Sequence, residues 1–237
     1  MNILKEFSHN DKCSYLDNKE QTTHYKIINN CSAQTTQELV ERGYRRFGKM
    51  YFRPICADCQ ECQSIKIDVE NYSFSKSEKR VLKKVNNLEI RMQTPTLSQN
   101  HLNLFDKYHR FMEEKKNWNF QNVTGDHYYN SFVTGHAEYG KEVLYFYEEK
   151  LIAVDLIDIL EDGISSIYFY YDPSYSHLSL GKLSLLLQIQ YAKEVKKQWI
   201  YLGYYVEDCP SLNYKANYKP YTTLQGRPSL EEQYIWI

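Results

Sequence analysis

The chain of 237 residues is 42% hydrophobic and 25% charged, with a formal net charge of -1 at pH 7. This composition excludes a disordered or fibrous protein, and it supplies enough apolar surface for one large domain or two modest ones. The charge balance singles out no class of partner. No apolar run is long enough to span a membrane, and residues 1–13 lack the pattern of a signal peptide. We therefore expect a cytoplasmic protein with no membrane partner.

Six cysteines occur, and three of them fall in the run CADCQEC at residues 56–62. Disulfides are rare in a reducing cytosol. The spacing therefore favours metal binding, redox chemistry or free thiols.

Residues 1–95 mix short elements with turn residues. Thr35 followed by Glu38 predicts a brief helix that Gly43 can end, and the alternating residues of 64–70 predict a half-buried strand. Ser75 and Glu78 have capping-box spacing, which predicts a helix from there to about residue 88. That helix carries five basic residues that can lie against phosphates, although a solvated helix face explains them equally well: Lys76, Lys79, Arg80, Lys83 and Lys84.

Residues 94–98, TPTLS, predict a joint between two domains, 1–95 and 96–237. Beyond it, Ser98 can cap a helix whose apolar stripe ends near Trp118, and a second short helix is expected over 126–135. Strands follow at 142–149, 150–160 and 164–173, with a hairpin turn at Asp162-Gly163. A helix over 179–198 and a strand over 199–204 complete the order.

This order predicts an α+β fold in which a smaller cysteine-containing N-terminal domain precedes a mixed sheet. The arrangement resembles the GCN5-related acyltransferase (GNAT-like) fold, in which a turn leads from a strand into a helix and then into a parallel strand. Acyl-CoA users of that fold carry several glycines at the turn to cradle a pyrophosphate, whereas SHLSLGKLS has only Gly181. The turn thus argues against acetyl-CoA as donor, and an acetyl-CoA N-acetyltransferase remains a distant alternative.

Longer motifs resemble one family over nearly the whole chain. They are CSYL (13–16), RGYRRFGKMYFRPICADCQEC (42–62), FSKSEKRVLKK (74–84), DLIDILEDGISSIYFYYDP (155–173), SLGKLSLLLQI (179–189) and YLGYYVEDCPSLNYKANYKP (201–220). The chain resembles the arginyl/leucyl-tRNA-protein transferases of the N-end rule pathway, most of all the bacterial leucyl branch. The resemblance implies transfer of leucine from Leu-tRNA to proteins that begin with Asp or Glu, which marks them for degradation. No cofactor is required for such a transfer.

The resemblance also suggests site residues. Alternation places Tyr168, Tyr170 and Asp172 on one strand face, where a carboxylate can bind or deprotonate the incoming amine. The catalytic candidates are Asp158, Tyr168, Tyr170, Asp172 and Tyr204. The alternative is that the tyrosines fill the sheet face and Asp172-Pro173 only opens a turn.

Recognition of an acidic N-terminal residue calls for a cation, preferably arginine with its two-pronged guanidinium. Arg45 or Arg46 is our first choice, followed by Arg53 and Lys215. Other residues expected to line the substrate cleft are Gly181, Tyr205 and Tyr214.

The family resemblance bears on the cysteines as well. Some family members, in the eukaryotic arginyl branch, have an N-terminal Cys-x-x-Cys and a later cysteine pair that can hold an iron-sulfur cluster, whereas Leu16 replaces the second cysteine here. Four thiols still make a candidate set for zinc or a [4Fe-4S] cluster, with free thiols as the alternative: Cys13, Cys56, Cys59 and Cys62. Cys31 and Cys209 are expected to be ordinary thiols.

Two further functions stay open. Arginyl transfer would need acidic groups in the amino-acid pocket, and Asp155, Asp158 and Asp172 leave it possible. A zinc-containing RNA-binding protein without catalysis would use only the basic helix and the cysteine run.

Overall fold

The computed structural model describes residues 2–116, 118 and 122–237. The first sheet is antiparallel, with strand order β1-β2-β4-β3, and consists of β1 (Asn2–Lys12), β2 (Glu20–Asn29), β3 (Arg45–Phe47) and β4 (Met50–Pro54). Helix α1 (Ala33–Glu41) packs beside it. The predicted helix exists, but its cap is Ser32, whose side chain accepts a hydrogen bond from the backbone N–H of Thr35. Gly43 follows the helix with a φ of +82°, which favours glycine.

The second sheet has seven strands in the order β11-β5-β10-β9-β8-β7-β6. Their bounds are β5 (Gln63–Asp68), β6 (Glu89–Gln93), β7 (Gly140–Tyr147), β8 (Lys150–Ile159), β9 (Gly163–Tyr171), β10 (Trp199–Tyr205) and β11 (Tyr221–Thr223). Strands β9 and β10 pair in parallel, and the other neighbours pair antiparallel. The predicted mixed sheet is therefore confirmed. Because β5 and β6 come from the first part of the chain, both parts contribute to this sheet, and the division at residue 95 stays a prediction.

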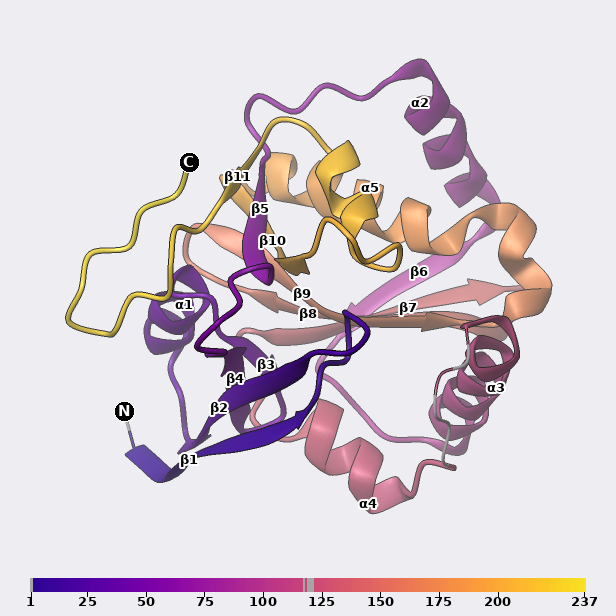
Figure 1. The fold of residues 1–237 in the computed structure, drawn as a ribbon. Helices are drawn as coiled ribbons and strands as arrows, with labels where there is room; N and C mark the ends of the chain where they lie inside the picture. Colours follow the sequence, from indigo (N-terminus) through magenta and orange to yellow (C-terminus); the bar gives the residue numbers. More distant parts are fainter. Residues whose placement is uncertain (1, 117, 119–121) are drawn as a thin grey trace.

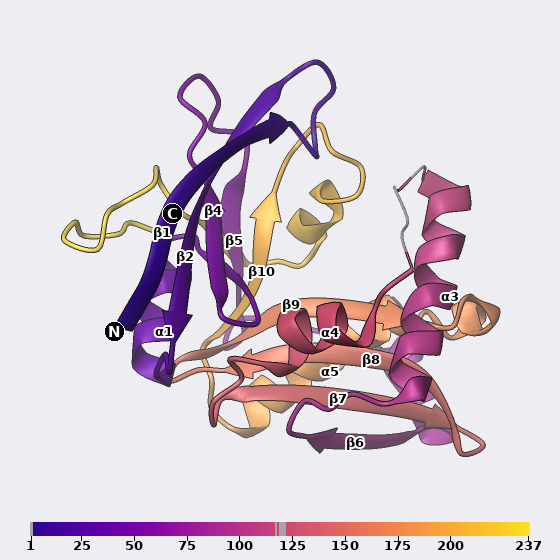
Figure 2. The same ribbon diagram turned by 90° about the horizontal axis from the view of Figure 1, so that it is seen from below.

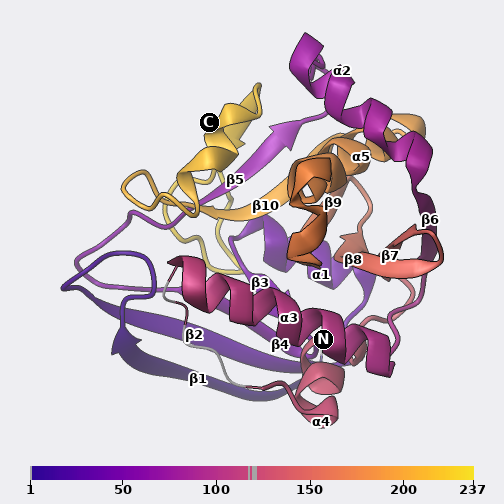
Figure 3. The same ribbon diagram turned by 90° about the vertical axis from the view of Figure 1, so that its right-hand side faces the viewer.

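Helices cover both faces of the second sheet (Figures 1 and 3). Helices α2 (Lys76–Leu82) and α5 (Leu180–Glu194) cover one face, and their apolar residues join the larger core. Helices α3 (Gln99–Lys116) and α4 (Gly125–Tyr128) cover the other face over a second, aromatic core. The capping box at α2 is confirmed, but the α-helix ends at Leu82 and continues as a 3-10 helix to Asn87. The helix expected over 126–135 is a short α-helix followed by a π-helical turn, Tyr129–Val133.

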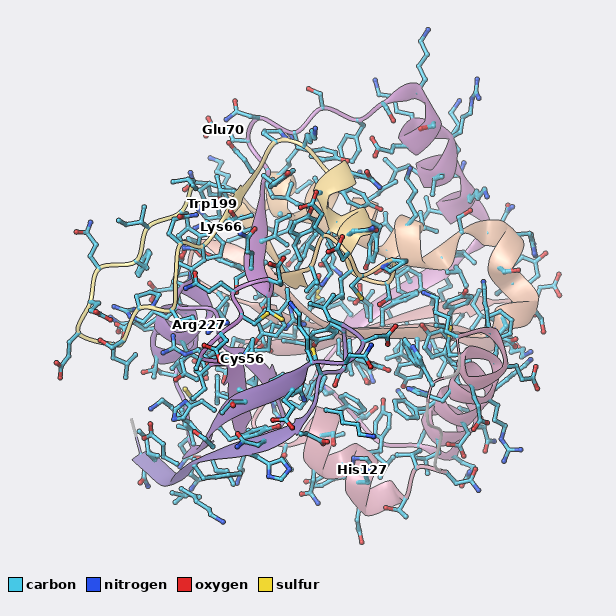
Figure 4. The ribbon with its side chains drawn as sticks, in the orientation of Figure 1. Cys56, Lys66, Glu70, His127, Trp199 and Arg227 are labelled. Atoms are coloured by element: carbon cyan, nitrogen blue, oxygen red, sulfur yellow. The ribbon has the colours of Figure 1, made fainter. Side chains whose placement is uncertain are left out.

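The first sheet stands beside β5 and β10 (Figure 2), and buried polar contacts join the two. Lys66 on β5 forms a 3.0 Å ion pair with Glu41 of α1. The same ammonium lies 4.2 Å from the ring centre of Trp199 (Figure 4). It also lies 4.4 Å from the ring centre of Trp236, one residue before the C-terminal residue. The C-terminal segment thus closes over the junction of the two sheets. Within the described part of the chain, no helix is long and apolar enough to cross a membrane.

Candidate active site

Strands β9 and β10 begin as a parallel pair and then separate. Their paired register runs from Trp199 opposite Gly163 to Tyr201 opposite Ser165. Beyond Tyr201 the register of β10 with β5 shifts, and Gly203 adopts a φ of +77°. The carbonyl groups of β9 that follow Ser165 therefore need partners other than β10.

Arg45 of β3 supplies these partners. Its Nη2 atom donates to the carbonyl oxygens of Ser166 at 2.5 Å and Ile167 at 3.1 Å. The Nη1 atom is buried and makes no hydrogen bond to any described residue. A Cβ added to Gly203 would lie 2.2 Å from Nη1, so the guanidinium fits only because that position is glycine. The space between the strands thus holds a buried cation, one N–H of which has no acceptor among the described residues.

A second cation lies beside the first. Lys215 is 8% exposed, and its Nζ donates to the backbone oxygen of Tyr204 at 2.6 Å. Burial, and secondarily the charge of Arg45, lower the pKa of Lys215 to about 7. Lys215 can therefore exchange a proton near neutral pH, unlike an ordinary lysine.

Tyrosines surround the two cations. The hydroxyl of Tyr204 is buried and lies 3.1 Å from both the Gly43 and Phe52 carbonyl oxygens, which fixes the strand end against the first sheet. Tyr214 is 48% exposed as a residue, but the partial desolvation of its hydroxyl raises its pKa, and the charge of Arg45 opposes that rise. Of the sequence candidates, Arg45, Tyr204, Tyr214 and Lys215 are therefore brought together here.

The cysteine segments border the same opening. Burial and then the neighbouring Cys62 thiol raise the pKa of Tyr15 to about 12, while the positive charge of Arg45 opposes the rise. Tyr15, from the CSYL motif, thus lies near both Arg45 and Cys62. Sequence reasoning did not name Tyr15 as a site residue, because nothing in the motif shows which of its four residues turns toward the cleft.

The four proposed metal ligands gather without forming a metal site. Burial, followed by the effects of Cys13, Cys56 and Cys59, raises the pKa of the Cys62 thiol to about 12, so the four thiols lie near one another. In the parts of the chain that the structure describes, no three His, Cys, Asp or Glu side chains are placed to hold a metal ion. The residues as placed do not fit zinc or a cluster.

Arg227 fixes the backbone of the cysteine segment through hydrogen bonds. It donates to the backbone oxygens of Cys56 at 2.8 Å and Cys59 at 2.6 Å, and Figure 4 shows Arg227 beside Cys56. The backbone N–H of Thr22 lies 3.4 Å from the sulfur of Cys56. The loop is therefore supported by protein contacts.

Arg46 and Asp158 bind each other. Arg46 donates from Nε to Oδ2 at 2.8 Å and from Nη2 to Oδ1 at 2.5 Å, while its Nη1 bonds the carbonyl oxygens of Gly48 and Gly135. Arg46 is 5% exposed and Asp158 is fully buried. The charges of Arg46 and Asp158 thus neutralise each other inside the protein. Arg45 differs, because no carboxylate among the described residues pairs with its guanidinium. The expected roles of this pair toward a substrate stay predictions.

The predicted common face of Tyr168, Tyr170 and Asp172 is confirmed, and it is the face that α3 covers. The Tyr168 hydroxyl lies 2.8 Å from Nε2 of His109, and the Tyr170 hydroxyl lies 2.6 Å from that of Tyr128. Asp172 binds Lys107 at 2.6 Å and Lys150 at 2.9 Å. Burial raises the Asp172 pKa, but these lysines and Ser174 outweigh burial and hold it well below its usual range. Asp172 also caps the turn after β9, as the alternative interpretation expected.

The remaining candidates lie around the opening or away from it. Arg53 donates to the backbone oxygens of Arg42 at 2.9 Å and Pro228 at 2.8 Å. Tyr205 packs against the core on the α5 side. Gly181 lies in the first turn of α5, where an added Cβ would make only ordinary contact with a phenylalanine ring. No steric need for glycine is evident at that position.

The basic residues of α2 and of the 3-10 helix that follows it form one exposed surface, which we call the basic surface of α2. Lys76, Lys79, Arg80 and Lys83 are exposed, whereas Lys84 donates to the His177 backbone oxygen at 2.6 Å and to Ser179 Oγ at 3.3 Å. Because His177 and Ser179 immediately precede α5, Lys84 fastens the basic surface to the start of that helix.

These features define an α+β protein with a mixed, mainly antiparallel sheet and a buried cationic site between two separating strands. The chain belongs to the arginine-tRNA-protein transferase family, because models described as the N terminus and the C terminus of arginine-tRNA-protein transferase match residues 11–80 and 100–225.

Relatives named aspartate/glutamate leucyltransferase support this membership. One from Campylobacter jejuni is 52% identical over 227 residues, covering 95% of both chains. Another from Helicobacter hepaticus is 39% identical and covers 100% of this chain and 98% of the relative. Among solved structures, one described as L-PGS from Bacillus licheniformis has a TM-score of 0.47 and 13% identity, covering 61% of this chain and 45% of that chain.

Proposed function

We propose that the chain is an aspartate/glutamate leucyltransferase, which transfers leucine from Leu-tRNA to the α-amine of proteins that begin with Asp or Glu. One observation carries the proposal: the buried Nη1 atom of Arg45 lacks a partner among the described residues, inside the opening between β9 and β10. A buried guanidinium N–H requires an acceptor, and a carboxylate is the acceptor that suits it best. The names of the relatives agree with an acidic acceptor residue.

The second cation accounts for the proton of the reaction. The acceptor amine attacks the ester carbon of leucyl-tRNA, so a C–N bond forms, the C–O bond to the ribose breaks, and the ribose oxygen gains a proton. The amine loses one proton as the peptide bond forms. We assign the acceptance of that proton to the neutral form of Lys215, because its pKa is lowered to about 7. An aminoacyl ester is already activated, so orientation and this proton transfer supply most of the catalysis.

The other sequence candidates take supporting places in this proposal. The acceptor carboxylate is held by Arg45 near Tyr204 and Tyr214, while the exposed basic surface of α2 binds the tRNA phosphates. The mixed sheet acts as a GNAT-like acyltransferase core built mostly from residues 96–237, and the N-terminal domain of residues 1–95 adds β5 and β6 to it. The two matched family regions, 11–80 and 100–225, fall on either side of this division. We place the reaction in the cytoplasm, where charged tRNA is available, and the product is a protein marked for degradation.

A two-donor assay tests the proposal. The chain is incubated with peptides beginning with Asp, Glu, Asn or Gln and with tRNA charged with either leucine or arginine. We expect leucine to be attached to the Asp and Glu peptides. Arginine attached in place of leucine would instead establish the arginyl alternative, and no transfer from either donor would contradict both.

An Arg45→Gln variant tests the role of the buried cation. Loss of charge-assisted bonds to the acceptor lowers kcat/KM for the Asp peptide about tenfold or more, and it narrows the preference for Asp over Asn. Arg42→Gln is the matched control, because Arg42 also donates to carbonyl groups but near the exposed end of α1. An equal loss of tRNA binding and acceptor selectivity in Arg45→Gln would contradict the assignment.

A further inference from the structure

A groove of about 200 Å³ lies between the second half of α5 and strands β6, β7 and β8. Figure 1 shows α5 on the face of these strands opposite α3. The groove walls are mainly apolar and include Val143, Ile157 and Leu187. Because drug-sized pockets occupy about 300–1,000 Å³, this groove suits a group of amino-acid size.

Asp155 lines the groove with one open oxygen. The residue is 1% exposed, and both of its hydrogen bonds fall on Oδ2, from Ser184 Oγ and from Gln188 Nε2 at 2.8 Å. Across the residues that the structure describes, no hydrogen bond reaches Oδ1. Burial raises the Asp155 pKa to about 6 against the lowering by Ser184 and Gln188, so the carboxylate is ionised at neutral pH. An ionised carboxylate that lines a mainly apolar groove favours a cationic donor as its partner.

The charge of the groove restricts its ligand. No lysine, arginine or histidine occurs among its described lining residues, and Glu194 adds a second carboxylate. A ligand must therefore bring its own positive charge, and a free carboxylate on the ligand would be repelled. The leucyl group of an aminoacyl ester has an ammonium, an apolar side chain and no carboxylate. Free leucine fails the last requirement.

Two hydrogen bonds connect the groove to the buried cationic site at Arg45. Gln188, which binds Asp155, accepts a 2.5 Å bond at Oε1 from Ser166 Oγ. The backbone oxygen of the same Ser166 accepts the bond from Arg45. One residue of β9 therefore separates the anionic groove on the α5 face from the cationic site next to β3.

We infer that this groove is the donor subsite, in which Asp155 Oδ1 binds the α-ammonium of the leucyl group and the apolar walls enclose its side chain. The inference rests on the proposed function, since it takes an aminoacyl ester as the donor. Each substrate then binds at a site of opposite charge. The donor amine binds the anionic groove at Asp155, and the acceptor carboxylate binds the cationic site at Arg45.

Binding of small probes to the unmodified full chain tests the subsite. Leucinamide has the ammonium without the carboxylate, and we expect it to shift the methyl NMR signals of Val143, Ile157 and Leu187. Its affinity should exceed that of leucine about tenfold or more, because leucine carries the repelled carboxylate. Argininamide should bind more weakly than leucinamide, since its guanidinium meets apolar walls. Equal affinity for leucine, or shifts confined to other methyl groups, would overturn the inference.

A variant adds an independent measurement. Asp155→Asn removes the anion and should weaken leucinamide binding about tenfold, whereas Asp126→Asn, an exposed residue on the opposite face of the sheet, should change it less than about twofold. Unchanged binding in folded Asp155→Asn would overturn the inference. Transfer of leucine from tRNA without any leucinamide effect at the groove would refute the subsite alone. Failure of leucyl transfer to every acceptor peptide would instead refute the proposed function.

Discussion

Gly203 and Arg45 share one space between β9 and β10, since a Cβ on Gly203 would lie 2.2 Å from Arg45 Nη1. The positive φ of Gly203 moves β10 away from β9, and the guanidinium then bonds the carbonyl oxygens that β10 leaves unpaired. Glycine at this position therefore creates the opening and also leaves room for the cation that occupies it.

A Gly203→Ala variant should lose transfer activity, because the methyl group displaces Arg45. It should also lose about 1–2 kcal/mol in the free energy of unfolding from the left-handed backbone. Gly226→Ala is the matched control: Gly226 has a φ of +63°, but an added Cβ there would meet no described atom within 4 Å. Both variants should lose stability in urea unfolding, and only Gly203→Ala should lose kcat/KM. Equal activity in the two variants would contradict the steric role of Gly203.

The lowered pKa of Lys215 should make stability depend on pH. The folded-state pKa is about 7, whereas lysine in an unfolded chain titrates near 10.4. Between these values the unfolded chain binds more protons, so the free energy of unfolding contributed by Lys215 rises with pH. Below pH 7 the cost of burying the charge is fully present. Unfolding in urea from pH 6 to pH 10 should show this slope in the native chain and a smaller slope in Lys215→Met.

The pH dependence of kcat tests whether Lys215 takes part in catalysis, separately from its effect on stability. If neutral Lys215 accepts the proton, kcat at saturating substrates rises with pH through about 7, and Lys215→Met loses that rise. The acceptor amine itself titrates near 7.7–8.0 and must be followed in parallel. Lys5→Met, on exposed β1, is the control that should keep both pH dependences. A pH profile of kcat that Lys215→Met leaves intact would remove Lys215 from the chemistry.

The strand and helix order of residues 142–204 was predictable because each element carries a local signal. Apolar strands, a hairpin turn and an amphipathic helix follow one another there, and β9 and β10 pair in parallel as expected. The sheet formed by β1 to β4 was not predicted. Strand β1 is exposed along nearly its whole length, so it shows no alternation of apolar and polar residues. Strand β6 was missed for the same reason.

The site was predictable in its residue types more than in its pairings. The sequence named both Arg45 and Arg46, but adjacent residues of a strand point to opposite faces. Arg45 enters the opening beside β9, while Arg46 binds Asp158, 112 residues away in the sequence. No local pattern reveals a contact over that separation. The requirement for glycine at residue 203 likewise depends on Arg45, which comes from the other sheet.

The Arg46–Asp158 pair gives a stability prediction. Asp158→Asn removes one partner of a buried ion pair and leaves the Arg46 charge uncompensated, which should cost about 3–5 kcal/mol in the free energy of unfolding. Replacing both partners with Met and Leu should cost less than the single change, since no isolated charge is then buried. Glu61→Gln, at an exposed position, should be nearly neutral. An inactive Asp158→Asn with native stability would instead favour a direct catalytic role for Asp158.

The exposed basic surface of α2 gives the last prediction, on donor binding. Changing Lys79 and Lys83 to alanine should raise the KM for Leu-tRNA while leaving the KM for the acceptor peptide unchanged. Each lost phosphate contact should reduce the salt dependence of tRNA binding by about 0.7–0.9 in the log–log slope. Lys5→Ala with Lys12→Ala on β1 removes the same charge from a distant exposed strand and is the matched control. If the two double variants reduce the slope equally, the effect is one of net charge, and α2 is not the tRNA surface.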